Sequence, residues 1–464
     1  MPSTFFGLEI GLRALRANQR GLDVVSQNIA NASNPGYSRQ TANLGAAEPY
    51  TRPSLRGETI LGQLGTGVIV DSITRTRDLL GDGRLRAELA TSGRLGAGRD
   101  NLSQVEAIFN DTGNTGLSNP LSEFWQSWQE LSNAPGDVSV RTTVIDRANA
   151  LTSAIGDGYR RLQQQRVDLD TQVRQAADQV NSIAAQIADL NGSIAQVKFA
   201  GQQPNDLADR RDVLLDQLAE LTRVDVTNSP SGMVSVFVGN RPLVEGTTSQ
   251  DMTTTVGPGG MARVTWQRDG ADVTFASGTI RGLLDQRDSV IPQMQSTLDG
   301  LASGLISAVN AAHAAGFGLD DTGPNPPGRL FFTGTGAADI AVSSDVAADP
   351  RRIAAAGSAG ATGDGSGALA IAGAITSSGI IDNYRAFAAE LGTRSQSATR
   401  AADSQAALVA QLQQRREETS GVSLDEETVS LLKYRQAYEA SSRVVTTMDQ
   451  MLDTLINRTG VVGL

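Results

Sequence analysis

Both ends of this 464-residue chain carry apolar residues at the seven-residue spacing of a coiled-coil seam. Near the C-terminus the two registers of the repeat hold Leu424, Leu431, Tyr438, Val445 and Leu452, and Tyr434, Ser441, Met448 and Leu455. Near the N-terminus the stripe consists of Leu8, Leu15, Leu22 and Ile29, widened by Leu12 and Val25. The spacing predicts one helix over about 4–32 and another from Leu424, and each needs a partner.

A rough energy comparison indicates how firmly these ends could hold each other. Ordering about 60 residues costs on the order of 1–2 kcal/mol each, whereas burying roughly eight seam side chains returns about 1.5–3 kcal/mol each. Backbone hydrogen bonding narrows the difference without closing it. We therefore expect ends that are loose in the isolated chain and become ordered against neighbouring copies or another assembly. The alternative is an ordinary antiparallel helix pair that closes a globular domain.

Composition limits the classes of partner. The net charge of −11 and the pI of about 4.8 argue against nucleic acid and against an anionic membrane surface. No run of eighteen apolar residues is present, and residues 1–21 lack the apolar core of a secretory signal. The absence of cysteine excludes disulfides and cysteine chemistry.

The middle of the chain reads as mainly helical with one β-rich insert. Short strands are expected at 37–43 and 67–73, and helices at 75–109, 121–132, 138–197 with a kink near Gly156 and Gly158, 282–315 and 380–419. Alternating Val and Thr residues predict a small β domain at 224–280, and 316–379 reads as a Gly/Ala-rich segment with two short strands. The predicted fold class is thus mainly α with a small β domain. Its parts are a terminal coiled-coil domain (1–40 with 424–464), an elongated helical domain (41–223 with 281–423) and the β domain (224–280).

No constellation of catalytic, cofactor or metal-binding residues stands out. Asp206, Asp209 and Asp212 are three apart, but acids suit a helix start, and Asp206 is expected to pair with Arg210. His313 is the sole histidine and has no cysteine to share a zinc site. The glycines between 363 and 367 lack the strand and helix of a nucleotide-binding loop and read as a flexible loop, and Phe124, Trp125 and Trp128 read as core. We expect no enzyme, cofactor or metal.

The end of the first helix carries a longer, specific string. Asn28-Ile29-Ala30-Asn31-Ala32 is followed by Asn34-Pro35-Gly36-Tyr37-Ser38-Arg39-Gln40. Small residues permit close helix approach, asparagines can cap the helix end, and Gly36 permits a positive φ. The string resembles the N-terminal signature of the bacterial flagellar axial proteins of rod, hook and hook-associated type. The residues that carry this resemblance are Asn28, Ile29, Ala30, Asn31, Pro35, Gly36, Tyr37, Arg39 and Gln40.

Two further strings narrow the resemblance. Ser420 to Glu427 and Leu431 to Ser441 are similar to the C-terminus of the hook-associated protein 1 family, and the Asn-Asp-Leu string at 205–207 with Arg211-Asp212 is a weaker match. Flagellin has paired terminal helices but lacks the Asn-Ile-Ala-Asn string, so the match is to this family in particular.

The resemblance implies a structural subunit that joins the flagellar hook to the filament. Its partners would be other copies of the chain, the hook protein, a second junction protein on the filament side, and a cytoplasmic export chaperone at the C-terminal segment. It also implies type III export without a cleaved signal peptide and an extracellular place in the flagellum. The alternatives are a secreted needle-tip or translocator-like coiled-coil protein, or another rod or hook axial protein.

Overall fold

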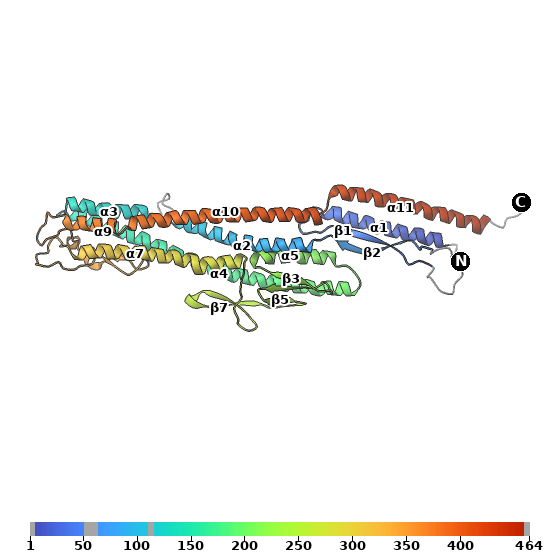
Figure 1. Cartoon of the computed structure of the whole chain (residues 1–464), viewed down its shortest axis with the longest axis horizontal. Coiled ribbons are helices and arrows are strands. Elements are labelled where there is room, and N and C mark those ends of the chain that lie inside the picture. The colour runs from blue at the N-terminus through green and yellow to red at the C-terminus, as the bar shows by residue number, and fades with distance from the viewer. Residues whose placement is uncertain (1–4, 51–63, 110–115, 459–464) are drawn as a thin grey trace.

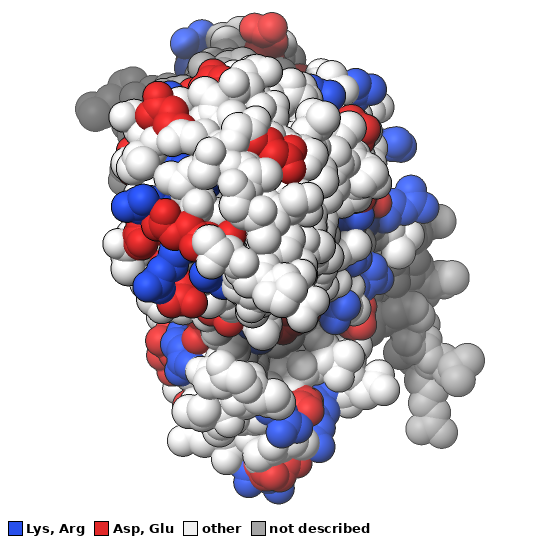
Figure 2. Space-filling view, turned by 90° about the vertical axis from the view of Figure 1, so that its left-hand side faces the viewer, with Lys and Arg blue, Asp and Glu red and all other residues white. Residues whose placement is uncertain are grey.

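The computed structural model describes residues 5–50, 64–109 and 116–458 of an elongated, mainly helical molecule (Figure 1). The terminal helices α1 (Phe6–Asn31) and α11 (Leu424–Asp453) lie side by side at one end, and α10 (Ile380–Ser420) runs along the body toward the other. That other end, the tip, contains α3 (Ser118–Asn133), α9 (Ser366–Ser377) and the loops between α7 and α9; uncharged side chains cover much of it (Figure 2). The mainly helical fold with paired terminal helices is as predicted.

Long helices and one short helix build the body. The long helices are α2 (Leu79–Ile108), α4 (Val138–Phe199), α5 (Asn205–Leu221) and α7 (Ile291–Ala314). The short helix α6 (Thr279–Asp285) precedes α7, with a π-helical turn at Gln286–Val290 between them. α4 is a single helix of 62 residues that continues through Gly156 and Gly158, where a kink was predicted. A side chain at 158 would place its Cβ 3.2 Å from the Phe109 ring. Gly158 therefore permits the close packing of α4 against Phe109.

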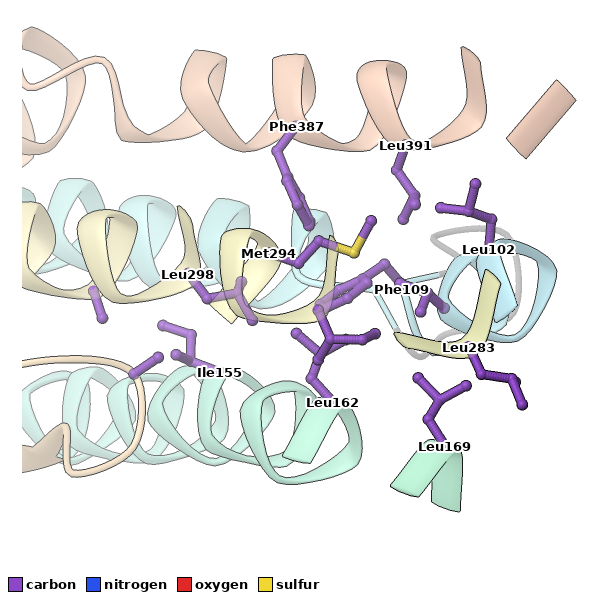
Figure 3. Packing of buried hydrophobic residues seen from close by; sticks show 14 of the residues in the cluster. Leu102, Phe109, Ile155, Leu162, Leu169, Leu283, Met294, Leu298, Phe387 and Leu391 are labelled. Atoms are coloured by element: carbon purple, nitrogen blue, oxygen red, sulfur yellow. The ribbon is translucent and has the colours of Figure 1, made fainter. Parts of the chain in front are cut away.

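One continuous apolar core follows the helices from the tip into the β region. Leu162 and Leu169 of α4 point toward Leu283, Met294 and Leu298 (Figure 3), and the rings of Phe109 and Phe387 meet edge to face at 5.2 Å. At the tip, Phe124 and Trp128 are fully buried against Phe331, which confirms their prediction as core. Trp125 is only partly buried and donates through Nε1 to Thr376.

The β region consists of small antiparallel sheets on one flank of the body. Strands β3 (Asp225–Asn228), β4 (Val234–Val238), β5 (Arg241–Glu245) and β6 (Thr248–Ser249) form one sheet in that order, and β7 (Met252–Val256) pairs with β8 (Ala262–Trp266). Val234, Val236 and Val238 alternate inward and join the core shared with α4. A separate hairpin of β1 (Gln40–Ala46) and β2 (Val68–Arg75) packs on α1.

The segment 316–379 is more ordered than its composition predicts. It holds strands β9 (Phe332–Thr333) and β10 (Ala341–Val342), and also α8 (Ser344–Ala348) and α9. The flexible-loop prediction for the glycines is wrong at Gly365 and Gly367, because α9 begins at Ser366 and a Cβ at either glycine would meet the backbone of Ser132 or Ala355. Gly363 lies in the loop before α9, with nothing within 4 Å of its Cβ position. Among the described helices, none is both long and apolar enough to cross a membrane.

Candidate assembly site at the terminal helix pair

The terminal helices α1 and α11 run antiparallel and touch along a line of small residues. A Cβ at Gly7, Gly11 or Gly21 would lie 2.5–2.8 Å from the side chains of Met448, Val445 or Tyr434. Between these contacts Asn18 donates to Ser441 at 3.4 Å. The glycines let the two backbones approach closely, as small residues do at tight helix crossings.

The predicted N-terminal stripe lies beside this contact line and not on it. Gly7, Gly11 and Gly21 each precede a predicted seam leucine by one residue, which is roughly 100° around the helix axis. Leu8, Leu15, Leu22 and Ile29 are half-buried, Leu12 is exposed, and Val25 is buried. The structure therefore places most of the leucine stripe on the flank of the pair.

The predicted C-terminal seam divides into two groups. Leu431, Tyr434, Val445, Met448 and Leu452 are half-buried, whereas Leu424, Tyr438 and Leu455 are exposed. Within the described part of α11, Glu427 is the one residue that is fully buried. The helix is thus covered along one side alone.

The signature turn after α1 is built around Asn28, which is 1% exposed. Its Nδ2 donates to the Gln40 carbonyl oxygen at 2.8 Å and to Glu427 at 3.1 Å, while its Oδ1 accepts from the Tyr37 hydroxyl and the Gln40 N–H. Gly36 has φ +88°, and a Cβ there would lie 2.4 Å from Val213 of α5. Burial, together with nearby acids including Asp206, raises the pKa of Tyr37 well above its usual value.

The remaining signature residues surround this centre. Asn31 donates to the Gln27 carbonyl oxygen, Ala30 and Pro35 are exposed, and Ile29 is half-buried. Arg39 donates to Glu427 and Glu426, both at 2.7 Å, and its N–H donates to the Ser420 carbonyl oxygen. The turn thereby joins α1 to the start of α11.

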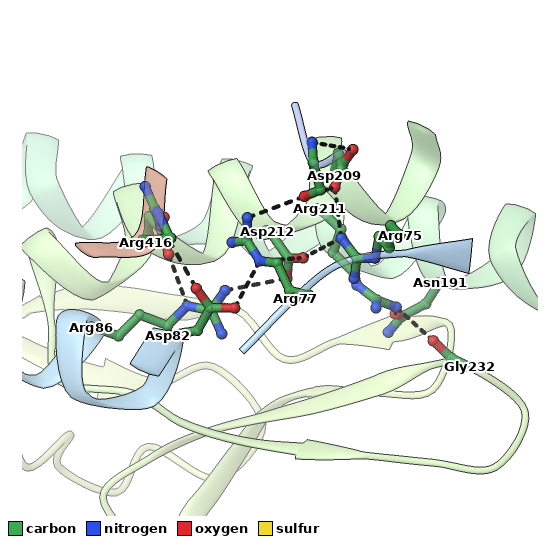
Figure 4. Close-up of polar contacts among 12 residues, drawn as sticks. Arg75, Arg77, Asp82, Arg86, Asn191, Asp209, Arg211, Asp212, Gly232 and Arg416 are labelled. Atoms are coloured by element: carbon green, nitrogen blue, oxygen red, sulfur yellow. Dashed lines mark hydrogen bonds and ion pairs between the residues drawn. The ribbon is translucent and has the colours of Figure 1, made fainter. Parts of the chain in front are cut away.

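A buried cluster of arginines and aspartates, here named the hub, connects this turn to the body (Figure 4). Its members are Arg75, Arg77, Arg86 and Arg416, and Asp82, Asp209, Asp212 and Asp216. Ser38 of the turn donates to Asp209 through its N–H and its hydroxyl. Arg75 then bridges Asp209 at 2.8 Å and Asp212 at 2.6 Å. The hub therefore ties the signature turn to α2, α5 and α10.

The side-chain partners of residues 205–212 differ from the predicted ones. No Asp206–Arg210 ion pair is found among the described residues; Asp206 accepts from Gln40 at 2.9 Å instead. Arg211 reaches the other way and donates to Asn191 of α4 and to the Gly232 carbonyl oxygen, and Asn191 bonds the backbone of Val234. The single helix α5 thus contacts both the signature turn and the β region.

Opposing charges set the protonation of the hub. Burial would raise the pKa of Asp212, but the guanidiniums of Arg75, Arg77 and Arg86 outweigh it and hold this pKa below the usual range. Burial dominates at Asp82, whose pKa is raised despite Arg77 and Arg86. Burial also lowers the pKa of Arg211 to about 10. The arrangement is a neutralised structural network, and no group of residues fit to hold a metal ion occurs in the described ranges.

The hub was not predicted, although the sequence contains a signal for it. On α5 the buried stripe includes Ala208 and Leu215, and Arg211 and Asp212 occupy the same stripe. Charged residues at the apolar positions of an amphipathic helix indicate a buried ion network. Their partners could not be assigned, because they come from separate elements.

Comparisons with known proteins place this geometry in a family. Residues 102–332 match the family model of the flagellar hook-associated protein FlgK helical domain. Residues 413–458 match that of the flagellar basal body rod FlgEFG protein C-terminal region, and residues 8–37 that of the flagella basal body rod protein.

Two relatives match along nearly their whole length, and others over part of it. The chain is 31% identical to flagellar hook-associated protein 1 of Bacillus subtilis strain 168, with all of both chains covered. It is 25% identical to that of Escherichia coli K12, over 96% of this chain and 98% of the relative. In Salmonella typhimurium LT2 the identity is 28% over 69% of this chain and 58% of the relative. A solved flagellar hook junction protein FlgK from Burkholderia pseudomallei aligns with 54% of this chain and 46% of its own, at 25% identity and a TM-score of 0.49.

Proposed function

Because the chain belongs to the flagellar hook-associated protein 1 family, it is a structural protein of the hook–filament junction, and we propose that its terminal helix pair carries the subunit contacts. The observation that supports this most is the apolar surface that the pair leaves uncovered. Leu12, Leu424 and Tyr438 are 37%, 54% and 38% exposed. Apolar side chains at seam spacing stabilise a helix only when another surface covers them.

The exposed Leu12, Leu424 and Tyr438, together with half-buried leucines of α1, form an apolar flank suited to a neighbouring copy. Leu8, Leu12, Leu15 and Leu22 lie roughly 100° around α1 from the glycine contact line. The β1–β2 hairpin covers a different side of α1, because Ile10 lies against Gly67. A further subunit can therefore pack on the flank without displacing the hairpin.

Self-assembly with the hook on one side and a second junction protein on the filament side follows from this role. We propose export through the flagellar type III apparatus without a cleaved signal peptide, and an extracellular place in the flagellum. α11 packs against α1 along one side only, so an unfolded C-terminal segment held by a cytoplasmic chaperone would leave the core of the body intact. The role needs no catalysis, and we propose no enzymatic activity.

We propose three functional parts: residues 1–40 with 424–464 for assembly, 41–223 with 281–423 as the elongated body, and 224–280 as the β domain. The assembly part joins the body at Gly421 and through the hub. A needle-tip or translocator-like role, and a role as another rod or hook protein, are not favoured, because the full-length relatives are hook-associated proteins 1.

The test removes the flank while leaving the fold. Leu12→Ala, Leu424→Ala and Tyr438→Ala are combined, and the control combines Leu330→Ala and Leu369→Ala, which are 50% and 57% exposed at the tip. The purified flank variant should keep the circular dichroism and Tm of the natural chain. In cells lacking the natural chain it should be exported into the medium yet be missing from isolated hooks, and motility should be lost.

The control variant should assemble and support swimming. Normal incorporation and motility of the flank variant would contradict the proposed role. Replacing Leu431, Tyr438 and Val445 by Ala would be less selective, because Val445 also contacts α1 within the same chain.

A further inference from the structure

Strand β7 has an edge with unpaired main-chain groups, and its hairpin with β8 lies at the margin of the β region (Figure 1). In an antiparallel pair, successive residues of a strand direct their N–H and C=O groups alternately toward the partner strand and away from it. The groups of Met252 point away from β8, because both of them bond to the Asn181 side chain. The groups of Thr254 and Val256 therefore point the same way, and no hydrogen bond to them is found among the described residues.

The sequence of this edge lacks the features that usually protect an exposed strand. Met252–Val256 contains no charged residue and no proline, and its pairing with β8 has no bulge. The Val256 side chain is 79% exposed. Unpaired N–H and C=O groups along a strand edge bind a further strand through main-chain hydrogen bonds. The ligand that this edge fits is therefore an extended stretch of polypeptide.

Strand β3 has a second outward edge in the same β region. It lies at the end of its sheet, and Val234 of the neighbouring β4 bonds through its N–H and its C=O to the Asn191 side chain, not to β3. Because Val234 is paired with Asn228, the alternation turns the main-chain groups of Asn228 and Val226 away from β4. No hydrogen bond to those groups is found within the described ranges. Each copy of the chain thus offers one outward edge on β3 and another on β7.

We propose that β7 of one copy pairs antiparallel with β3 of a neighbouring copy, so that their β regions join in one sheet. In a ring or shallow helix of identical subunits, corresponding parts lie at similar heights, and the β region of one subunit therefore meets that of the next. The pairing of two different edges is heterologous and continues from subunit to subunit, whereas β7 paired with β7 would close a two-fold dimer. This contact rests on the proposed self-assembly, and it adds an interface on the β region to the one on the terminal pair.

The two edges match in length and in orientation. The register that uses all the outward groups places Thr254 opposite Asn228 of the neighbour, and each of these residues exchanges two hydrogen bonds with the other. The same register places Val256 opposite Val226, which gives the exposed Val256 side chain an apolar cross-strand neighbour. Met252 is buried and Val226 packs against the core, so the apolar face of both strands points inward. One sheet can therefore continue across the two subunits with a single inner face.

The cysteine-free chain permits a direct disulfide test of this register. Thr255 and Thr227 have exposed side chains, and the register makes them a non-hydrogen-bonded pair with Cα atoms about 4.5 Å apart, which suits a disulfide. Two differently tagged chains are expressed together, one with Thr255→Cys and the other with Thr227→Cys, and isolated hook–filament junctions are mildly oxidised. A disulfide-linked dimer carrying both tags is expected. Thr255→Cys paired with Ser139→Cys at the distant tip should give none.

A proline at position 256 tests whether the main chain of β7 makes the contact. Val256→Pro removes an outward N–H and leaves the hydrogen bonds between β7 and β8 in place, so the purified variant should keep the Tm of the natural chain. Added to the Thr255→Cys chain, it should lower the yield of the mixed dimer roughly 10-fold, while Val256→Thr should preserve the yield.

Three results would overturn the contact. Junctions that contain both tagged chains but give no mixed dimer would do so and leave the proposed function standing. Dimers that carry only the tag of the Thr255→Cys chain would replace it by a two-fold β7 pair. A mixed-dimer yield unchanged by Val256→Pro would show that the β7 edge does not make the hydrogen bonds.

Discussion

Asp212 at the centre of the hub provides a test of how the body and the terminal pair are joined. It accepts hydrogen bonds from Arg75 at 2.6 Å and from Arg86 at 3.2 Å, and Arg77 lies 3.8 Å away. Asp212→Ala leaves three buried guanidiniums without this carboxylate, but each keeps one other aspartate: Asp209, Asp216 and Asp82. Removing one partner of a buried ion pair lowers the free energy of unfolding by about 3–5 kcal/mol. Because each arginine keeps another aspartate, we expect a loss of about 3 kcal/mol for Asp212→Ala.

The expected shift in melting temperature follows from chain length. An unfolding entropy of about 2.1 cal/mol/K per residue gives about 0.8 kcal/mol/K for the roughly 380 residues between the terminal segments, which unfold together. Asp212→Ala should therefore lower Tm by about 4 °C in calorimetry at pH 7. The matched control is Asp206→Ala on the same helix, whose exposed carboxylate bonds only Gln40 among the contacts described, and it should shift Tm by less than about 1 °C.

The pH dependence gives a second check on the same variant. Because the pKa of Asp212 is lower in the folded chain than in the unfolded chain, its stabilisation is complete above about pH 4 and is lost as pH falls through the folded pKa. The difference between the natural chain and Asp212→Ala should therefore be constant from pH 5 to 7 and shrink below pH 4. Equal Tm shifts for the Asp212 and Asp206 variants would refute this account of the hub.

Two other positions give independent predictions. Gly36→Ala should lower the free energy of unfolding by about 1–3 kcal/mol, because φ is +88° and the new Cβ would lie close to Val213. The control Gly246→Ala, with φ +60° and nothing within 4 Å, should lower it less. Denaturant titrations measure both free energies. His313 accepts at Nε2 from the Ala354 N–H and donates from Nδ1 to the Arg329 carbonyl oxygen, and burial lowers its pKa to about 4. The unfolded chain binds this proton at a higher pH than the folded chain does. The free energy of unfolding should therefore fall by about 3 kcal/mol as the pH is lowered from 6.5 to 4, and this contribution should be nearly constant above pH 7. His313→Gln should remove that part of the slope, and an unchanged slope in urea titrations would contradict the assignment.

Long periodic segments could be predicted from sequence because their pattern repeats many times. The length of α4 and the alternation of Val234, Val236 and Val238 are examples. α9 was missed because its buried stripe, which includes Ile371 and Ile375, is short and lies among glycines. Its place depends on backbone contacts that local sequence does not report.

The candidate site, too, could be predicted from the sequence only in part. Leucine periodicity correctly located two terminal helices, but it does not tell which side of α1 meets α11, because the closest approach is made at glycines such as Gly11 and Gly21. The signature string was found, yet its contact with Glu427 spans 399 positions of the chain. The partners of Asn28 and Arg39 could be assigned only in three dimensions.

The central claim is that the terminal pair becomes firmly ordered on assembly. Amide hydrogen exchange tests it most directly, by comparing α1 and α11 with α4 in the purified chain and in isolated junctions. The account predicts fast exchange of both terminal helices beside a protected α4 in the purified chain, and slow exchange of all three in the junction. Terminal helices as protected as α4 in the purified chain would contradict it, because the pair would then be complete without neighbouring subunits.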